Sequence, residues 1–404
     1  MQVIKDCRSH KKVWLLILVA LISTMFVGFM WATKVGTPSV RNKIVVVAKT
    51  PVPKSISSNV LFLGNTYWGR YINDWSMSSD LKYAYPFSRL NEFNRSDYDA
   101  WISGLECPTV AGVSITSYEE DSTLNFNCSP NYLSEAVKWF TAFTLANNHT
   151  DNQGEAGFEE TRQHLEEKSI QYFGHYDYRN VEDVCEVISL PVTITKDDST
   201  IEKGNLPVAM CGFHGVFGVP SVEAVAEIKK YSSYMPVIAM PHMGVEYKTA
   251  PDQLKIDFYH SLIDAGADIV LGDHPHFIQN SESYNGHLIV YSMGNFMFDQ
   301  QDYFEVTRSA GIRVVMKTGN QDSDLLEKWL ILGETCVSFK DDCLNQAIQQ
   351  KLAKLNMTYQ FGVVGTSDAD KITKPATEAQ QTSILERLNW QSTMNNLQAP
   401  YSSL

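Results

Sequence analysis

Side chains that can bind metal ions recur in this chain where short apolar runs stop. In DIVLGDHPHF (268–277), an apolar run leads into an aspartate and two histidines that are separated by a proline. Imidazole nitrogens, carboxylates and amide oxygens are the ligands that zinc, manganese and iron accept in proteins. A metal ion held by such groups acidifies bound water or polarises a phosphoryl or carbonyl oxygen. The residues of this kind near the end of an apolar run are Asn65, Glu106, Asn148, His149, His242, His274, His276 and Asn295.

The proline between the two histidines favours a site that is formed before an ion binds. Pro275 fixes its own φ and restricts His274 to extended geometry, so we expect both imidazoles to be held in place. Each residue also has a simpler interpretation. A histidine after a strand usually makes a local hydrogen bond, and an Asn after Gly usually forms a turn. The joint arrangement, with donors at successive strand ends, favours a metal centre.

The apolar runs predict strands that are covered on both faces, because they are nearly continuous in apolar character instead of alternating. They lie at 59–65, 99–106, 141–149, 235–244, 268–276 and 287–296. Segments 155–169 and 252–266 place apolar residues at helical spacing between these runs. Alternating strands and helices indicate an α/β fold, in which ligands bind beyond the carboxyl ends of the strands.

The C-terminal part of the chain differs in character. Segments 308–319 and 326–334 are predicted to be two further strands, 341–356 a polar helix, and 371–404 one amphipathic helix with irregular ends. We therefore place one domain at 58–318 and a C-terminal extension at 319–404.

The overall charge restricts the partners of the protein. The chain of 404 residues carries a formal net charge of −13 and no long run of Lys or Arg. Such an acidic surface disfavours nucleic acid as a partner. It leaves open a cell-surface binding module that meets cationic partners, an interpretation that only the net charge favours.

Residues 13–33 predict a single membrane-spanning helix. They contain no charged residue and would span about 30 Å, the thickness of the bilayer hydrocarbon. Four basic residues precede them, so we expect residues 1–12 in the cytoplasm, 34–57 as a linker, and the main domain outside the cell membrane. A cleaved signal peptide is the alternative, but its apolar stretch would be only about 7–15 residues long.

Cysteine usage fits this topology. Cys7 lies on the predicted cytoplasmic side, and six further cysteines lie on the outer side, where disulfides persist. The short polar segment between Cys336 and Cys343 favours a disulfide between these two. For Cys185 and Cys211, which lie in apolar runs, buried free thiols are an equally good interpretation.

Five motifs carry a family resemblance. They are FLGNTYWGR (62–70), SGLECP (103–108), LANNHTDNQGEAGFEETRQHLEEKSIQYFGH (145–175), MPHMGVEY (240–247) and AGADIVLGDHPHFIQNSESYNGHLIVYSMGNFMFD (265–299). In order and spacing they resemble the CapA family of capsule and poly-γ-glutamate biosynthesis proteins. The resemblance implies a calcineurin-like metallophosphoesterase fold, with two packed mixed β-sheets flanked by helices. It also implies that the protein takes part in the synthesis or export of an anionic surface polymer, next to the membrane subunits of the polymer synthase.

Carried over position by position, the resemblance assigns roles to residues of this chain. One or two divalent ions (Mn, Zn or Fe) would bind to Glu106, Asn148, His242, His274 and His276, with Asn65 at the position of a further ligand. His149 would be the acid or the phosphate-contacting residue, and Arg70 would face the site.

This chain departs from the family motifs at two positions. The family has Asp where this chain has Asn65, and usually Asn where this chain has Gly104. An amide supplies one neutral oxygen instead of a charged carboxylate, so a pair of ions is less secure. One ion on the three histidines and Asn148 remains consistent with the residues. Two alternatives stay open: a metal-dependent hydrolase of a phosphoester or of polymer amide bonds, and a non-catalytic assembly factor.

Overall fold

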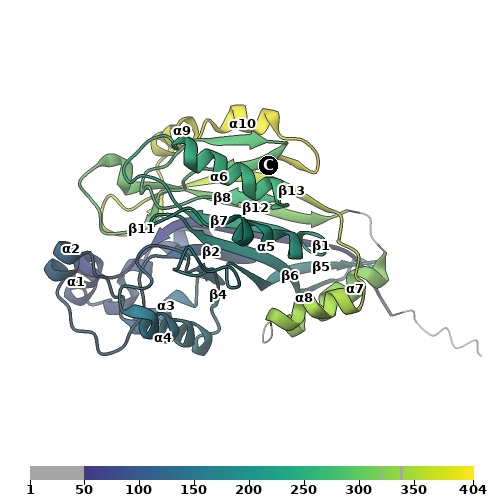
Figure 1. The fold of residues 1–404 in the computed structure, drawn as a ribbon, viewed down its shortest axis with the longest axis horizontal. Coiled ribbons are helices and arrows are strands. Elements are labelled where there is room, and N and C mark those ends of the chain that lie inside the picture. The colour runs from purple at the N-terminus through teal and green to yellow at the C-terminus, as the bar shows by residue number, and fades with distance from the viewer. Residues whose placement is uncertain (1–49, 320–321, 337–339) are drawn as a thin grey trace, which may run out of the picture. The chain divides into compact units, whose positions relative to one another are not determined.

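The structure is a computed structural model that describes residues 50–319, 322–336 and 340–404. These residues form a mixed α/β fold with a 15-stranded sheet and helices on its faces (Figure 1). The strands are β1 (Pro53–Thr66), β2 (Ala100–Leu105), β3 (Ala142–Thr144), β4 (Gln171–Phe173), β5 (Cys185–Lys196), β6 (Ile201–His214), β7 (Val237–His242), β8 (Ile269–Leu271), β9 (Ser281–Tyr284), β10 (His287–Val290), β11 (Asn295–Met297), β12 (Arg308–Thr318), β13 (Met357–Ser367), β14 (Lys374–Pro375) and β15 (Tyr401–Ser403). The α-helices are α1 (Arg70–Ser78), α2 (Ser117–Thr123), α3 (Leu133–Ala136), α4 (Gly154–Glu167), α5 (Val222–Ser232), α6 (Gln253–Asp264), α7 (Ser323–Cys336), α8 (Lys340–Gln349), α9 (Glu378–Arg387) and α10 (Trp390–Asn396). The predicted α/β class is confirmed.

The sheet branches at β1. The first part of this strand, Pro53–Ser57, pairs with β5, and its second part, Val60–Thr66, pairs with β2. On its other side β1 pairs with β12 and then with β11. The structure therefore joins into one hydrogen-bonded network what we expected to be two sheets. The physical reason is the length of β1, whose 14 residues pair with different neighbours along the strand.

Three branches extend from β1, and one of them runs through β12 and β13 to β14 and β15. The other two position the site. The first contains β2, β3 and β4, and its pairings are parallel. The second continues through β5, β6, β7, β8 and β10 to β9, and its pairings are parallel from β6 to β10. Parallel strands place their carboxyl ends at the same edge, so the loops that follow these strands gather there.

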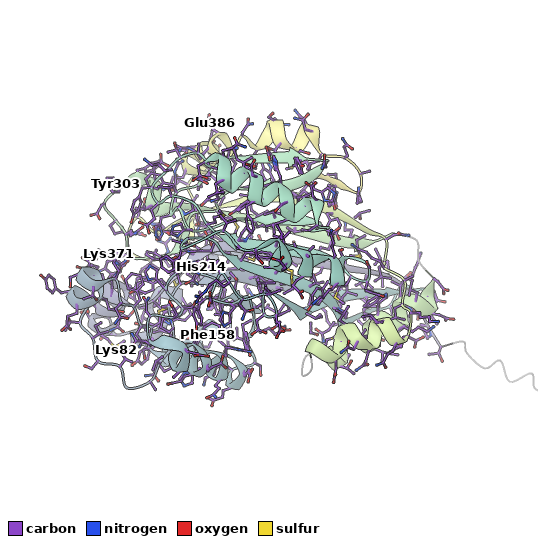
Figure 2. All side chains as sticks on the ribbon, viewed as in Figure 1. Lys82, Phe158, His214, Tyr303, Lys371 and Glu386 are labelled. Atoms are coloured by element: carbon purple, nitrogen blue, oxygen red, sulfur yellow. A yellow bond between two sulfur atoms is a disulfide. The ribbon has the colours of Figure 1, made fainter. Side chains whose placement is uncertain are left out.

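Apolar side chains form two cores on opposite faces of the first branch. Phe62 and Ile102 face the core that is shared with β5 to β8, whereas Leu61 and Trp101 face the second core. Neighbouring residues of a strand point to opposite faces, so a strand buried on both sides must be apolar throughout. The second core is covered by helices that include α4, which carries Phe158 (Figure 2). The prediction of strands covered on both faces is confirmed.

The two helices predicted between strands are confirmed. Segment 155–169 corresponds to α4, and 252–266 corresponds to α6. The side chain of Asp252 caps α6 by accepting a hydrogen bond from the backbone N–H of Lys255. Gly266, with φ of +112°, follows the end of this helix, a conformation that glycine adopts readily.

The strand predicted at 326–334 is wrong, because this segment lies in the helix α7. Leu326, Trp329, Leu330 and Gly333 are buried, at helical spacings of three and four residues, while Ile331 is exposed. The segment is apolar enough to resemble a strand, but its buried positions follow the helical period.

The prediction of one helix over 371–404 is also wrong. This segment contains β14, α9, α10 and β15. Asn389, in the left-handed conformation with φ of +52°, separates α9 from α10. Pro375 lies in β14 and Pro400 directly precedes β15, and a proline does not continue a helix.

The N-terminal predictions fall almost entirely outside the described residues. The predicted membrane helix at 13–33, the segment 1–12 and the linker up to residue 49 lie there. The end of the predicted linker, 53–57, belongs to β1. Within the part of the chain that the structure describes, no helix is both long and apolar enough to cross a bilayer.

Three disulfides join Cys107 to Cys128, Cys185 to Cys211, and Cys336 to Cys343. The predicted pair Cys336–Cys343 is confirmed. Cys185 and Cys211 are direct neighbours in the register of β5 and β6, so the alternative of buried free thiols is wrong for them. The pairing of β5 with β6 brings these two cysteines together. Their apolar surroundings in the sequence did not indicate this pairing.

Candidate metal centre

The structure gathers the predicted site residues where several strands end. Asn65 lies near the end of β1, Glu106 directly follows β2, and His242 is the last residue of β7. Asn148 lies in the loop after β3, and His274 and His276 lie in the loop after β8. All six of these side chains are buried.

His242, His274 and Asn148 form one cluster. Nε2 of His242 lies 2.8 Å from Oδ1 of Asn148 and 3.1 Å from Nδ1 of His274. Burial lowers the pKa of both histidines well below its ordinary value, and neighbouring imidazoles lower it further. Both rings are therefore neutral at pH 7, which is the form that binds metal ions.

The turn DHPH adopts a conformation that differs from the prediction. His274 has φ of +93° and His276 has φ of +61°. Pro275 predicts an extended His274, and this prediction is wrong. Non-glycine residues in this region carry a strain of about 1–3 kcal/mol each and persist only where neighbouring structure holds them. The backbone N–H of Tyr247 contributes, because it donates to the carbonyl of Pro275 at 2.9 Å. Both imidazoles are thus held in place, by contacts as well as by the proline.

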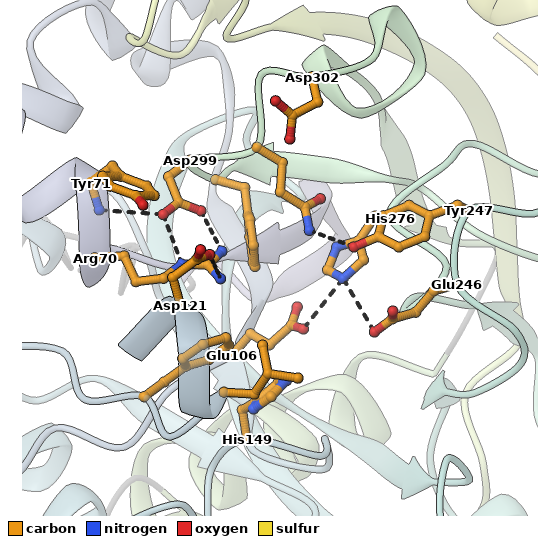
Figure 3. Close-up of a pocket in the computed structure, with 14 residues that line it drawn as sticks. Arg70, Tyr71, Glu106, Asp121, His149, Glu246, Tyr247, His276, Asp299 and Asp302 are labelled. Carbon is orange, nitrogen blue, oxygen red and sulfur yellow. Dashed lines mark hydrogen bonds and ion pairs between the residues drawn. The ribbon is translucent and has the colours of Figure 1, made fainter. Parts of the chain in front are cut away.

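His276 lies in a second group of polar side chains. Its Nδ1 lies 2.8 Å from Oδ1 of Asn295, and Nδ2 of Asn65 lies 3.2 Å from the same Nδ1. Its Nε2 lies 4.0 Å from a carboxylate oxygen of Glu106 and 3.9 Å from one of Glu246 (Figure 3). The ring of Tyr247 stacks on His276 with 5.6 Å between centroids. His276 therefore presents Nε2 to two acidic side chains.

Several buried acceptors of this group find no hydrogen-bond donor among the described residues. They are both carboxylate oxygens of Glu106 and Oδ1 of Asn65. Glu106 is 1% exposed. Burial raises its pKa well above the ordinary value, and the nearby Asp273 and Glu246 carboxylates raise it further. Buried acceptors without donors are costly unless a proton or a cation compensates them.

The two groups suit a divalent cation in different degrees. A tetrahedral ion with bonds of about 2.1 Å places its ligands about 3.4 Å apart, close to the 2.8 and 3.1 Å separations around Nε2 of His242. Across residues 50–319, 322–336 and 340–404, no three His, Cys, Asp or Glu side chains gather closely enough to form a complete site. The cluster of Asn148, His242 and His274 fits an ion because the amide oxygen of Asn148 is available as a third ligand beside the two imidazoles.

Arg70 lines a pocket that is also lined by Glu106 and His276, but not by Asn148, His242 or His274. Its guanidinium donates to both carboxylate oxygens of Asp299, at 2.6 and 2.8 Å. Burial opposes its charge, but the Asp299 carboxylate outweighs this effect and raises the pKa of Arg70. The pocket has a volume of about 270 Å³ (Figure 3). Arg70 therefore faces the site as a fixed positive charge.

His149 also lines the pocket. Its ring stacks on Phe126 at 4.1 Å between centroids, and its Nδ1 lies 2.9 Å from Oδ1 of Asn152. Burial lowers the pKa of His149 to about 4. The imidazole is neutral at pH 7, so it is better suited to hydrogen-bond a ligand than to deliver a proton from an imidazolium.

Gly104, one of the two departures from the family motifs, lies beside Asp273. A Cβ atom at Gly104 would lie 3.3 Å from Oδ2 of Asp273. This carboxylate is buried, and burial raises its pKa well above the ordinary value, although the Lys255 charge and the backbone N–H groups of His274 and Asn65 lower it. Glycine at position 104 thus leaves the space that the carboxylate of Asp273 occupies.

Four further residues belong to the site, although the sequence did not indicate roles for them: Glu246, Tyr247, Asp273 and Asp299. Asn295, which the sequence predicts as a strand-end donor, contacts His276. All four further residues lie within the motifs MPHMGVEY and AGADIVLGDHPHFIQNSESYNGHLIVYSMGNFMFD, so the motifs were the available signal. Their contacts depend on loops whose course the spacing does not predict.

Comparisons with known proteins identify the family of the chain. The family "Bacterial capsule synthesis protein PGA_cap" matches residues 59–300, which include all the predicted site residues. The PGA biosynthesis protein CapA of Bacillus subtilis (strain 168) is 27% identical over 315 residues, 72% of this chain and 74% of that protein. The capsule biosynthesis protein CapA of Bacillus anthracis is 24% identical over 310 residues, 74% of this chain and 71% of that protein.

A solved protein of Thermus thermophilus, TT1561, shares 12% identity and a TM-score of 0.31, over 63% of this chain and 93% of its own. This similarity is too low to show a shared fold or function. The family match, by contrast, covers more than half of the chain and includes every residue of the candidate centre. The chain therefore belongs to the bacterial capsule synthesis protein family PGA_cap.

Proposed function

We propose that this protein is a component of the machinery that makes or exports an anionic capsular polymer of the poly-γ-glutamate type. The observation that carries the proposal is the family match over 59–300, together with the polar side chains that gather within that range. Two relatives named for capsule or PGA biosynthesis support it.

The proposed place of action is the outer face of the cell membrane. The apolar segment 13–33, preceded by basic residues, supports an anchor whose N-terminus is cytoplasmic. Three disulfides in the described chain support an oxidising compartment for the main domain. The proposed partners are the growing polymer and the membrane subunits of its synthase.

A second candidate function is metal-dependent hydrolysis of a phosphoester or of a polymer amide bond. The cluster of Asn148, His242 and His274 favours it, because these three would hold the ion. When bound, the ion supplies Lewis acidity toward a phosphoryl or carbonyl oxygen. Arg70 binds a negatively charged group of the substrate, and His149 orients it by a hydrogen bond. The calcineurin-like metallophosphoesterase fold implied by the family resemblance belongs to this proposal.

The experiment deletes the gene from its host or replaces it with a gene for a variant. It then measures the amount and length of the polymer on the cell surface. Cells that lack the protein should lose surface polymer. Cells that carry His274→Ala separate the two functions: they keep the polymer if the protein acts only as an assembly factor, and lose it or change its length if the metal centre is required. His164→Ala, on α4 and hydrogen-bonded to the carbonyl of Thr109, is the matched control. Unchanged polymer in cells without the protein contradicts the proposal.

A further inference from the structure

The pocket that Arg70, Glu106 and His276 line carries an excess of negative charge. Arg70 is the only Lys or Arg among its described lining residues, and Asp299 already pairs with that guanidinium. A pocket of this charge attracts a cationic group and repels a purely anionic segment of a polymer. The carboxylates that line it are Glu106, Asp121, Glu246, Asp299 and Asp302.

Three hydrogen-bond acceptors face one another in this pocket. Nε2 of His276 lies 4.0 Å from a carboxylate oxygen of Glu106 and 3.9 Å from one of Glu246 (Figure 3). Both oxygens of Glu106 are buried and have no hydrogen-bond partner within the described chain. Nδ2 of Asn295 donates to Gln300, so Oδ1 of Asn295 accepts from Nδ1 of His276 at 2.8 Å. A neutral ring with its proton on Nδ1 leaves Nε2 as an acceptor.

The distances between these acceptors suit an ammonium group better than a metal ion. A tetrahedral ion places its ligands only about 3.4 Å apart. An ammonium group that donates at about 2.9 Å places its acceptors about 4–5 Å apart, because its N–H bonds diverge. The observed separations of 3.9 and 4.0 Å approach that range. An ammonium group also brings three donors, one for each acceptor.

Arg70 supplies a site for a negative charge in the same pocket. Figure 3 shows Arg70 with Asp121 and Asp299 on one side of the pocket and Glu246 on the other. The Asp121 side chain, 3.3 Å from Nη1 of Arg70, is 52% exposed, so it can move aside for a carboxylate of a ligand. The volume of about 270 Å³ lies below the about 300–1,000 Å³ of pockets for drug-sized ligands. The pocket therefore suits the end of a chain and not a longer segment.

We propose that this pocket binds the amino end of a γ-linked glutamate chain. The terminal ammonium group would donate to Glu106, Glu246 and Nε2 of His276, and the α-carboxylate on the same carbon would pair with Arg70. Only the residue at the amino end of such a chain carries a free ammonium group, because every other nitrogen belongs to an amide. The inference rests on the proposed function and adds that the protein holds one end of the polymer.

The test compares two γ-linked glutamate trimers, one with a free amino end and one N-acetylated. Calorimetric titration measures their binding to the full-length protein after dialysis against EDTA, so that no metal ion contributes. The free trimer should bind more tightly by about tenfold or more, because acetylation removes the charge and leaves the acceptors of Glu106 unpaired. Equal affinities, or no binding of either trimer, overturn the inference.

A substitution of Glu246 tests the residues of the pocket. Glu246→Gln should weaken binding of the free trimer by about tenfold and leave the acetylated trimer unchanged, because one charge-assisted hydrogen bond is lost. The Glu246 side chain is 42% exposed, so we expect the variant to fold. Glu327→Gln, the same change at an exposed position of α7, is the control and should bind both trimers as wild type does.

Unchanged affinity of Glu246→Gln for the free trimer also overturns the inference. Loss of surface polymer in cells without the protein, combined with any of these contrary results, leaves the proposed function standing.

Discussion

Nε2 of His242 lies 3.1 Å from Nδ1 of His274, although 32 residues separate them in the chain. The two rings meet at 62°, so their nitrogens converge while their planes do not stack. Burial keeps both rings neutral. Two neutral imidazoles that converge in this way are prepared for one ion.

Substitution of either histidine by alanine should weaken Zn²⁺ binding by more than about tenfold, because even changes outside the ligand set of a metal have effects of that size. Competition with a chromogenic chelator measures the affinity. His164→Ala, outside the site, is the control and should bind as wild type does. Unchanged Zn²⁺ affinity in His274→Ala is incompatible with the proposed centre.

The buried pair Arg70–Asp299 should contribute to stability in a way that an exposed pair does not. Their side chains are 7% and 1% exposed. Arg70→Met leaves the Asp299 carboxylate buried without its partner and should lower the free energy of unfolding by about 3–5 kcal/mol. Urea denaturation at neutral pH measures this change.

The exposed pair Arg179–Asp177 supplies the control, since the Arg179 side chain is 73% exposed. Arg179→Met should cost less than about 1 kcal/mol. The double variant Arg70→Met/Asp299→Leu should lose less stability than the sum of the two single changes. Simple additivity of the two changes contradicts a coupled buried pair.

Lys255 should make the stability of the protein depend on pH. Burial lowers the pKa of Lys255 to about 7, although the Asp273 and Asp252 carboxylates oppose this shift, whereas the ordinary value is 10.5. Between these two values the unfolded chain holds a proton that the folded chain has released. The free energy of unfolding therefore rises with pH in this window, by about 1.4 kcal/mol per unit at most.

Lys255→Met removes this titration while it keeps most of the apolar stem. The stability of the variant relative to wild type should be greatest below about pH 7 and should decrease as the pH rises toward 10. Urea denaturation of both proteins at about pH 7 and about pH 9.5 measures the difference. A relative stability that does not change with pH shows that Lys255 is charged in the folded protein.

The sequence predicted the convergence of donors because apolar runs and the polar residues after them are local features. Once parallel strands were expected, Asn148, His242 and His274 had to approach the same edge of the sheet. The approach of Glu246 to His276 was not predictable, because Glu246 lies in a polar loop and its distance of 3.9 Å from Nε2 of His276 depends on the path of that loop. The left-handed conformation of His274 was missed for the same reason, since tertiary contacts override the preference that Pro275 imposes.

The prediction of a strand at 326–334 was wrong, because this segment lies in the helix α7. A substitution at Gly333 tests how this helix packs. A Cβ atom at Gly333 would lie 2.0 Å from the carbonyl oxygen of Asn205, so α7 packs directly against β6. Gly333→Ala should therefore destabilise the protein by about 1–3 kcal/mol or more, although alanine favours helices more than glycine does. Thermal unfolding measures the effect.

Ile331→Ala is the matched control in the same helix, since Ile331 is 61% exposed. It should change stability by no more than about 0.5 kcal/mol. A Gly333→Ala variant as stable as wild type is inconsistent with the close contact between α7 and β6.

The most direct test of the metal centre is anomalous X-ray diffraction from crystals of the protein grown with Zn²⁺ or Mn²⁺. We predict an anomalous peak bounded by Oδ1 of Asn148, Nε2 of His242 and Nδ1 of His274. Crystals in which Nε2 of His242 keeps its contacts with the other two atoms, with no peak between the three at saturating metal concentration, contradict the proposed centre.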